Sequence, residues 1–343
     1  MASDRVSNCK NPPLVTIALP TFNRAPLLRG CVTSALAQTY GNFEVLVSDN
    51  ASTDETRSVL SQFTDSRLRV LRQKANIGLL PNWNACLAGA RGDYIIFLAD
   101  DDRIAPWLLQ RCVEMIRREP QVPIVVTLSN IYSGSIGKTF AARVSRSLET
   151  GIQDGSAILT EFLTDQITVT VCGVMMRTAV LRERGGLPLD FPHTADVAAW
   201  APLLLLGNAG FVNEACATFA YHDQSETARL SIEQILRDGW KMANLISYHA
   251  NENVRDAQKR RALQVRSRRC FARRGLRALS RYRKCGGGIQ TMLNFIWLFR
   301  GHLSNVNPAA VLQFVAIVLC PHWIAERIRQ LRPTVREGAA WTP

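Results

Sequence analysis

The chain has 343 residues, of which 47% are hydrophobic and 20% are charged, with 21 glycines and 15 prolines. This profile excludes a disordered chain, a collagen and a small disulfide-rich scaffold. The formal net charge of +13 is concentrated, because residues 255–284 carry thirteen Lys or Arg against one Asp. A segment of this charge density favours binding to phosphate groups, either of a nucleic acid or of an anionic membrane surface.

Nine cysteines are scattered along the chain without a C-x-x-C pair. This pattern favours a reducing compartment, with most of the cysteines buried as small apolar side chains. Residues 1–13 are polar and lack the apolar run that a signal peptide requires. We therefore expect synthesis and localisation in the cytoplasm.

The first part of the chain alternates short apolar runs with amphipathic stretches. Strands are predicted at residues 14–19, 43–47, 68–71, 94–98 and 124–128. Helices are predicted at 26–38, 81–90 and 106–118. A further helix is predicted to end at residue 63, with Ser52 or Thr53 as its N-cap. Short strands that alternate with longer helices are typical of βαβ units. The sequence therefore predicts an α/β fold whose mainly parallel sheet is covered by helices on both faces.

The second part of the chain changes character twice. Residues 129–155 are rich in Gly, Ser and Thr and are predicted to form an irregular, functional loop. A strand, a helix and an extended segment are then predicted at 168–176, 196–206 and 211–220. Helical patterns alone follow, so we divide the chain into an α/β domain, residues 1–228, and a basic, partly apolar helical C-terminal region, residues 229–343.

Carboxylates follow two of the predicted strands. Asp49 follows the second strand, and Asp100, Asp101 and Asp102 follow the fourth. Ligands of open α/β sheets bind at this edge, so these groups are expected to face one crevice. Three adjacent carboxylates repel one another, and a divalent cation such as Mg²⁺ or Mn²⁺, bound together with substrate phosphates, would compensate for the repulsion. A solvated acidic turn is the alternative.

Three segments resemble glycosyltransferase family 2, over most of the first 230 residues. LVTIALPTFNRAPLL at 14–28 resembles its first strand and turn, FEVLVSDNASTDET at 43–56 its second strand, and NIGLLPNWNACLAGARGDYIIFLADDD at 76–102 the segment with the DXD motif. The resemblance implies a Rossmann-like GT-A fold and metal-dependent, inverting sugar transfer. The donor would be a nucleotide-diphosphate sugar with UDP or dTDP, and the acceptor a hydroxyl of a glycan or lipid-linked molecule in cell-surface polysaccharide biosynthesis.

The resemblance also implies a donor site. The predicted donor-binding residues are Pro20, Thr21, Asn23, Arg24, Asp49, Asn76, Asn84, Asp100 and Asp101. Asp49 would accept a hydrogen bond from the imide N–H of uracil or thymine, which a carboxylate at a strand end is able to do. A helix cap is the alternative role for Asp49, and a structural turn is the alternative for Asn76 and Asn84.

The predicted metal ligands are Asp102, Asp100 and His222. The family pattern is usually D-x-D-D, and Ala99 occupies its first position here, so the sequence leaves open which carboxylate binds the metal. His222 lies in FAYHDQSET, which resembles a family segment whose histidine would bind the metal or the diphosphate. Ala220 stands where arginine is common in that segment. Lys138 and Arg143 are candidates to supply the missing charge.

Inverting transfer needs a carboxylate that removes the proton of the acceptor hydroxyl, on the face opposite the leaving diphosphate. Asp196 matches the acidic position of the family and is predicted to be this catalytic base, with Asp190 as the second candidate. A helix N-terminus would lower the pKa of Asp196, so burial against Trp200 or the substrate has to raise it. A plain N-cap is the alternative role.

Two apolar runs in the C-terminal region, 289–299 and 309–320, are shorter than the roughly twenty residues that span a bilayer. Together with the basic segment and nearby tryptophans, they fit helices that lie in a membrane surface. Packing on the catalytic domain or a homo-oligomer interface is the alternative. Few aromatic residues accompany the basic segment, so no nucleic acid partner is expected. We expect peripheral association with the inner face of the cytoplasmic membrane.

Two other functions remain open on the sequence. A nucleotidyltransferase would use the same carboxylate and metal chemistry and would release pyrophosphate. A basic nucleic-acid- or membrane-binding protein would carry the α/β domain as a vestigial catalytic domain.

Overall fold

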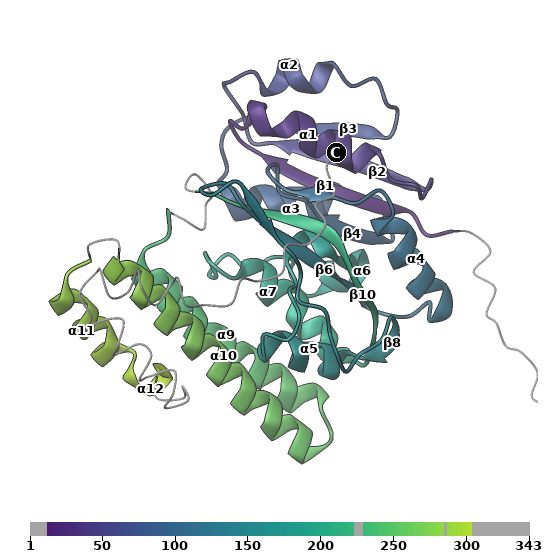
Figure 1. Cartoon of the computed structure of the whole chain (residues 1–343). Helices are drawn as coiled ribbons and strands as arrows, with labels where there is room; N and C mark the ends of the chain where they lie inside the picture. The colour runs from purple at the N-terminus through teal and green to yellow at the C-terminus, as the bar shows by residue number, and fades with distance from the viewer. Residues whose placement is uncertain (1–11, 223–228, 285–286, 304–343) are drawn as a thin grey trace, which may run out of the picture.

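The computed structural model describes residues 12–222, 229–284 and 287–303, and in these ranges a mixed sheet of ten strands forms the centre of the molecule (Figure 1). The strand order is β3-β2-β1-β4-β9-β6-β10-β5, with β7 beside β6 and β8 beside β10. The strands are β1 Val15–Thr21, β2 Phe43–Asp49, β3 Leu68–Arg72, β4 Tyr94–Phe97, β5 Arg103–Ile104, β6 Ile124–Ser133, β7 Lys138–Phe140, β8 Gly151–Asp154, β9 Val174–Arg177 and β10 Asn208–Tyr221.

The α/β fold class predicted from the sequence is confirmed, but the sheet is mixed and not mainly parallel as predicted. Parallel pairs join β1 to β2 and β4, β2 to β3, and β6 to β10. Antiparallel pairs join β9 to β4 and β6, and attach β5, β7 and β8. The helices are α1 Ala25–Leu36, α2 Thr56–Ser61, α3 Leu79–Gly89, α4 Leu108–Arg118, α5 Gly155–Leu163, α6 Thr178–Glu183, α7 Ala195–Trp200, α9 Ile232–Asn253, α10 Ala257–Lys284, α11 Ile289–Leu298 and α12 Arg300–Leu303.

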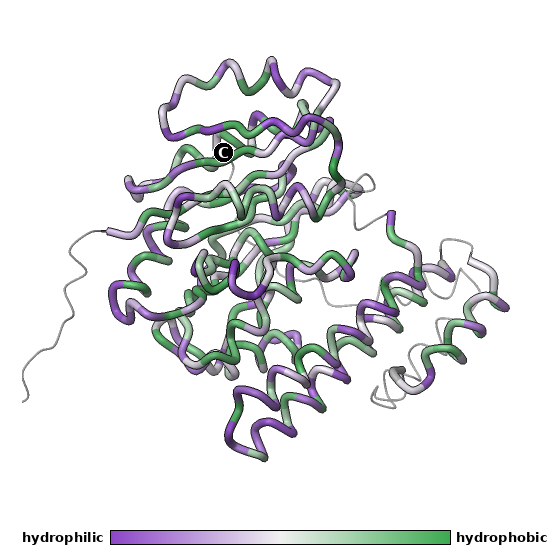
Figure 2. Tube along the Cα trace, turned by 180° about the vertical axis from the view of Figure 1, so that it is seen from behind, coloured by the Kyte–Doolittle hydropathy of each residue, from purple (hydrophilic) through white to green (hydrophobic). Residues whose placement is uncertain are grey.

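The sheet separates two hydrophobic cores. Ile17 of β1 and Ile96 of β4 pack with residues of α1 and α4, whereas Ala18 and Phe97 face the core that contains α3 and α5. Successive side chains of a strand point to opposite faces, so a strand with helices on both faces has to be apolar at every position. This geometry explains the continuous apolar runs of the sequence, and Figure 2 shows hydrophobic segments in the centre of the molecule.

The segment 129–155, predicted to be an irregular loop, contains parts of three strands. β6 continues to Ser133, and β7 and β8 pair with β6 and β10. The Gly, Ser and Thr residues hide this from the hydrophobic pattern, because edge strands are held by backbone hydrogen bonds and need no apolar face.

Three further boundaries differ from the sequence prediction. The second helix begins at Thr56, where the Asp54 carboxylate accepts a hydrogen bond from the Thr56 N–H at 3.0 Å, so Ser52 and Thr53 do not cap it. The predicted strand 168–176 contains the 3₁₀ turn Val171–Gly173 before β9. The helix predicted at 196–206 is α7 followed by a 3₁₀ helix, since Pro202 has no N–H to continue an α-helix.

The helical hairpin of α9 and α10 packs against the α/β domain. Met242 and Ile246 of α9 and Leu263 and Phe271 of α10 belong to the same hydrophobic core as α5. The hairpin also carries many hydrophilic residues (Figure 2). No helix in the described ranges is long and apolar enough to cross a bilayer. The apolar run predicted at 309–320 lies outside the described residues.

Candidate functional site

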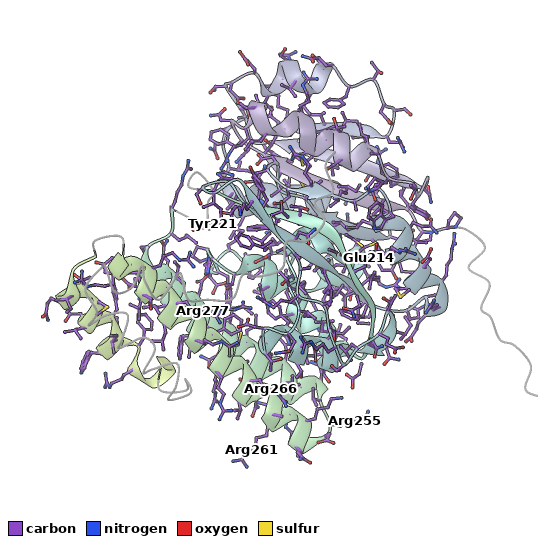
Figure 3. All side chains as sticks on the ribbon, viewed as in Figure 1. Glu214, Tyr221, Arg255, Arg261, Arg266 and Arg277 are labelled. Carbon is purple, nitrogen blue, oxygen red and sulfur yellow. The ribbon has the colours of Figure 1, made fainter. Side chains whose placement is uncertain are left out.

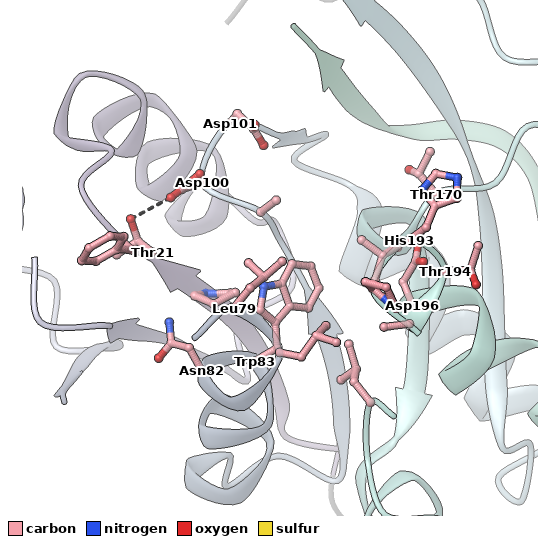
Figure 4. A pocket seen from close by; sticks show the side chains of 18 of the residues that line it. Thr21, Leu79, Asn82, Trp83, Asp100, Asp101, Thr170, His193, Thr194 and Asp196 are labelled. Carbon is pink, nitrogen blue, oxygen red and sulfur yellow. Dashed lines mark hydrogen bonds between the residues drawn. The ribbon is translucent and has the colours of Figure 1, made fainter. Parts of the chain in front are cut away.

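A cavity of about 570 Å³ opens where β1 and β4 end. Figure 4 shows its two facing walls. Thr21, Asp100 and Asp101 lie on one wall together with residues of α3, and this is called the donor wall below. The segment 192–197, at the start of α7, lies on the opposite wall, which is called the acceptor wall. Carboxylates of both walls therefore face one space, as expected for the edge where the strands of an α/β sheet end.

On the donor wall, Asp100 is a buried carboxylate beside another carboxylate. Its Oδ2 accepts a hydrogen bond from the Thr21 hydroxyl at 2.8 Å. Burial, followed by the charge of Asp101, raises the pKa of Asp100 to about 7, against the lowering effect of Thr21 and Arg24. Pro20, Thr21, Arg24, Asp100 and Asp101 all line the cavity, as the sequence led us to expect.

Asp101 and His222 form a pair that fits a divalent cation. The Asp101 Oδ2 and the His222 Nε2 are 3.0 Å apart, and both side chains retain some exposure. A carboxylate oxygen and an imidazole nitrogen are suitable ligands for Mn²⁺, and such ions commonly take few protein ligands when substrate phosphates complete the shell. In the described ranges no group of three or more His, Cys, Asp or Glu is arranged around a common metal position. A cation held by this pair would need further ligands from a bound substrate.

Asp102 does not fit its predicted role as a metal ligand. Its side chain is fully buried and does not line the cavity. Oδ1 accepts a hydrogen bond from the Ala220 N–H at 2.9 Å. Burial and the charge of Asp101 raise the pKa of Asp102 well above its ordinary value. The turn after β4 points this carboxylate into the protein, and it links the turn to β10.

Three predicted donor residues, Asn23, Asp49 and Asn84, lie outside the cavity. Asn23 has a left-handed backbone (φ 52°), and its Oδ1 accepts a hydrogen bond from the Thr53 N–H at 2.8 Å, so it joins the turns after β1 and β2. Asp49 accepts a hydrogen bond from the Ser52 N–H at 2.9 Å and lies 3.5 Å from the Arg72 Nε. It borders a second cavity, of about 440 Å³, together with Arg57 and Arg72. Asp49 therefore does not cap α2.

Of the predicted donor residues Asn76 and Asn84, the first lines the cavity and the second has a structural role. Asn76 lines the cavity, and its Oδ1 accepts hydrogen bonds from Asn50 and from the Gly78 N–H. Asn84 does not line the cavity, because its amide exchanges two hydrogen bonds of 2.9 Å with the backbone of Leu187. This geometry contradicts the donor-binding role predicted for Asn84.

Asp196, on the acceptor wall, is the second residue of α7, and Thr194 occupies the N-cap position. The plain N-cap alternative is therefore wrong for Asp196. Burial raises its pKa, and this outweighs the lowering effect of backbone N–H groups and of Arg274. A raised pKa makes a carboxylate a stronger base once it has lost its proton. Asp190, the second candidate, is exposed, pairs with Lys241 at 2.9 Å and does not line the cavity.

Several cavity residues were missed on the sequence. Trp83 of α3 stacks on Phe97, with ring centroids 5.3 Å apart, and lines the donor wall. His193 lines the acceptor wall, and burial followed by the charge of Arg274 lowers its pKa to about 4. Arg274 of α10 itself lines the cavity. Its only sequence signal was the basic segment, which does not identify the arginine that faces inward.

Lys138 and Arg143, considered as substitutes for the missing arginine at position 220, do not line the cavity. The basic side chains that line it are Arg24, Arg229 and Arg274. Cationic charge therefore reaches the cavity from the turn after β1 and from the helical region, and the segment 138–143 contributes none of it.

Comparisons with known proteins were made with this geometry in hand. The family model described as Glycosyl transferase family 2 matches residues 16–184. UDP-Glc:alpha-D-GlcNAc-diphosphoundecaprenol beta-1,3-glucosyltransferase WfgD of Escherichia coli is 28% identical over 202 residues, which cover 58% of this chain and 73% of the relative. An uncharacterized protein of Mycobacterium tuberculosis is 28% identical over 236 residues, which cover 67% of this chain and 74% of the relative.

A solved structure supports the fold. The crystal structure of TarS 1-349 from S. aureus in complex with UDP-GlcNAc superposes with a TM-score of 0.53 and covers 92% of this chain and 91% of that chain. The sequence identity is 15%, so this likeness concerns the fold alone.

Proposed function

The chain belongs to glycosyltransferase family 2, and on this premise we propose that it transfers a sugar from a UDP- or dTDP-sugar to a hydroxyl of a glycan or lipid-linked acceptor, with inversion at the anomeric carbon. The observation that carries the proposal is the cavity in which Asp100 and Asp101 face Asp196 across open space (Figure 4). Inverting transfer requires this arrangement, because the attacking hydroxyl and the leaving diphosphate lie on opposite faces of the sugar.

In the proposed reaction, the donor diphosphate lies on the donor wall. Arg24 supplies positive charge there, while Thr21 fixes the Asp100 carboxylate by a hydrogen bond. Asn76 holds the turn that leads into α3. The nucleobase lies toward Asp49, whose carboxylate accepts the imide N–H of uracil or thymine.

Asp196 acts as the general base. Its carboxylate removes the proton of the acceptor hydroxyl as the oxygen attacks the anomeric carbon, and the bond to the donor diphosphate breaks. Burial, which raises the pKa of Asp196, strengthens it as a base. His193 beside it has a pKa lowered to about 4, so its imidazole stays neutral and does not compete as an acid at neutral pH.

We propose that Asp101 and His222 hold a divalent cation, Mn²⁺ or Mg²⁺. When bound, the cation supplies positive charge that compensates the departing diphosphate. The acidic turn around Asp101 supports this assignment, since burial and mutual repulsion already raise the pKa of Asp100. Asp102 maintains the turn from behind through its hydrogen bond to the Ala220 N–H.

Cell-surface polysaccharide assembly is the proposed setting, because the relative WfgD is named for transfer to a diphosphoundecaprenol-linked sugar. We propose that residues 1–228 form the catalytic domain and that residues 229–343 contact the inner face of the cytoplasmic membrane. Exposed apolar side chains on α11, Leu293 and Trp297 among them, support this contact, as do the basic residues of α10.

The family assignment does not favour the two alternative functions. A nucleotidyltransferase has no use for a carboxylate base on the wall opposite the phosphates. A scaffold with a vestigial domain has no need for carboxylates on two walls that face one open cavity.

A thermal-shift screen of the full chain tests the proposal, using UDP, dTDP, GDP, CDP and their common sugars with and without Mn²⁺. We expect a uridine or thymidine diphosphate to raise the Tm, because a ligand that binds only the folded state stabilises it. Arg24→Gln should reduce the shift, whereas Arg261→Gln, at an exposed position of α10, should leave it unchanged. If none of the nucleotides shifts the Tm of the folded protein, the proposed function is wrong.

A further inference from the structure

Three arginines of α10 share one carboxylate beside the cavity. Asp165, which follows α5 with a left-handed backbone (φ 57°), pairs through Oδ2 with Arg273 at 2.7 Å and with Arg277 at 3.3 Å. Its Oδ1 lies 3.7 Å from Arg274. One negative charge against three positive charges leaves this cluster strongly cationic, and such a cluster favours binding of a polyanion.

Arg274 is held in a defined position in this cluster. Its guanidinium lies over the ring of Phe162, 4.7 Å from the centroid, and 5.4 Å from the centroid of Phe271. The same residue lines the cavity with Asp196 and His193. Its charge lowers the pKa of both neighbours, which places it within electrostatic range of the proposed base.

The positive charge continues along α10 toward Tyr221, the last residue of β10. Arg277 and Arg281 follow Arg274 at helical spacing, and the Arg281 guanidinium donates a hydrogen bond to the Tyr221 hydroxyl at 3.3 Å. Figure 3 shows Arg277 on the part of the hairpin nearer Tyr221, whereas Arg255 and Arg261 lie at its far end. Two regions of the basic helix therefore differ: the region that contains Arg274 borders the cavity, and the far end with Arg261 does not.

We propose that Arg274, together with Arg277 and Arg281, binds the phosphate groups of the acceptor, so that the acceptor is a sugar linked through a diphosphate ester. This inference rests on the proposed function and identifies the substrate class on its acceptor side. Arg274 acts as a binding and specificity residue, and Asp165 positions it.

The location of these arginines separates the acceptor phosphate from the donor phosphate. Asp100 and Asp101 lie on the wall opposite Asp196, where the donor diphosphate departs. Arg274 lines the same cavity within electrostatic range of Asp196 and His193, on the side where the acceptor hydroxyl has to be. An acceptor sugar that carries a diphosphate brings its negative charge to the Asp196 side of the reacting centre. A guanidinium at that place then orients the hydroxyl toward the base.

The test is calorimetric binding of undecyl diphosphate, below its critical micelle concentration, to the full chain saturated with UDP. UDP occupies the donor site, so the alkyl diphosphate reports a second site. We expect Arg274→Gln to weaken its binding about tenfold, because a charge-assisted hydrogen-bond partner is lost. Arg261→Gln is the matched control, since it removes the same charge from the same helix at the far end. Arg281→Gln, at an exposed position, tests the cluster if Arg274→Gln does not fold.

The outcomes separate the inference from the proposed function. Equal affinity of Arg274→Gln and Arg261→Gln for undecyl diphosphate overturns the inference, and so does a wild-type protein that binds UDP but no undecyl diphosphate. Weakened binding of UDP by Arg274→Gln, with undecyl diphosphate binding intact, assigns the arginine to the donor and also overturns it. A wild-type protein that binds no UDP contradicts the proposed function instead.

Discussion

The carboxylate of Asp238 in α9 accepts a hydrogen bond of 2.6 Å from the backbone N–H of His193 on the acceptor wall. The same oxygen accepts a second bond, of 3.1 Å, from the Thr194 N–H. The helical hairpin thus fixes the segment that carries Asp196. The helical C-terminal region therefore helps to form the acceptor wall of the cavity.

Removal of the Asp238 carboxylate is expected to destabilise the protein. Asp238→Ala leaves two backbone N–H groups in a buried place without their acceptor, and we expect a loss of about 2–4 kcal/mol in the free energy of unfolding. Urea unfolding at equilibrium measures it. Arg237→Ala, which removes an exposed pair with Glu233 on the same helix, should cost about 0.5 kcal/mol or less. Equal losses for the two variants would contradict the anchoring role.

Asp196→Asn is expected to lower kcat by about 10²- to 10⁴-fold, since the amide cannot accept the proton of the acceptor hydroxyl. Binding of UDP should remain as in the wild type, because Asp196 lies on the wall opposite Asp100 and Asp101. Transfer assays and nucleotide binding measure the two effects. Asp190→Asn is the matched control, because Asp190 pairs with Lys241 outside the cavity. A large loss of kcat in Asp190→Asn would transfer the role of base to Asp190.

The rate of transfer should fall at low pH as Asp196 becomes protonated, and this fall is called the acid limb of the pH profile. The base acts only when deprotonated, and its pKa is raised by burial, so activity falls at a higher pH than for an exposed aspartate. His193 titrates lower, at about 4, whereas Asp100 titrates at about 7. Arg274 lowers the pKa of Asp196, so Arg274→Gln should move the limb of kcat to higher pH. A limb that does not move in this variant would exclude Asp196 as its source.

Replacement of the paired ligands is expected to remove the Mn²⁺ effect on nucleotide binding. Asp101→Asn and His222→Gln each take away one proposed ligand of the cation, so Mn²⁺ should no longer strengthen UDP binding in calorimetry. Asp102→Asn, which keeps an oxygen for the Ala220 N–H and lies outside the cavity, should respond to Mn²⁺ like the wild type. The reverse pattern would assign the metal to Asp102.

The exposed apolar face of α11 is expected to contribute to membrane binding. Leu293 is 50% exposed and Trp297 67% exposed, whereas Met292 on the other face is buried against α10. Replacement of Leu293 and Trp297 together by serine should weaken binding to vesicles with anionic lipid by about tenfold or more. Val144→Ser, at an exposed position outside the helical region, is the control. A change in oligomeric state without any change in vesicle binding would instead identify this face as a protein interface.

Local sequence patterns were sufficient for the α/β class and for most strands of the first half. Ile17, Ala18 and Leu19 are apolar in succession because helices cover both faces of β1, and such a run is visible without a structure. The turns that carry Thr21 and Asp100 follow directly from where these strands end. The donor wall was therefore largely predictable, since its residues lie close to strand ends in the chain.

The direction of individual side chains required the tertiary structure. Asp100, Asp101 and Asp102 are adjacent in sequence, yet the turn sends the first two to the cavity and buries the third against β10. Asn84 has the same amide as Asn76 but meets the backbone of Leu187, more than a hundred residues away. Partners at such separations leave no local pattern in the chain.

On the acceptor wall, even less could be predicted from the sequence than on the donor wall. The sequence by itself determined that a basic helix exists and that Asp196 begins a helix. The tertiary structure decided that Arg274 reaches the cavity and that Asp238 holds the segment before Asp196. Charge density and hydrophobic periodicity are properties of a segment, so they can be determined from the sequence alone. The packing of α10 on α5 and α9 decides which arginine of α10 lines the cavity, and this packing depends on the whole hydrophobic core.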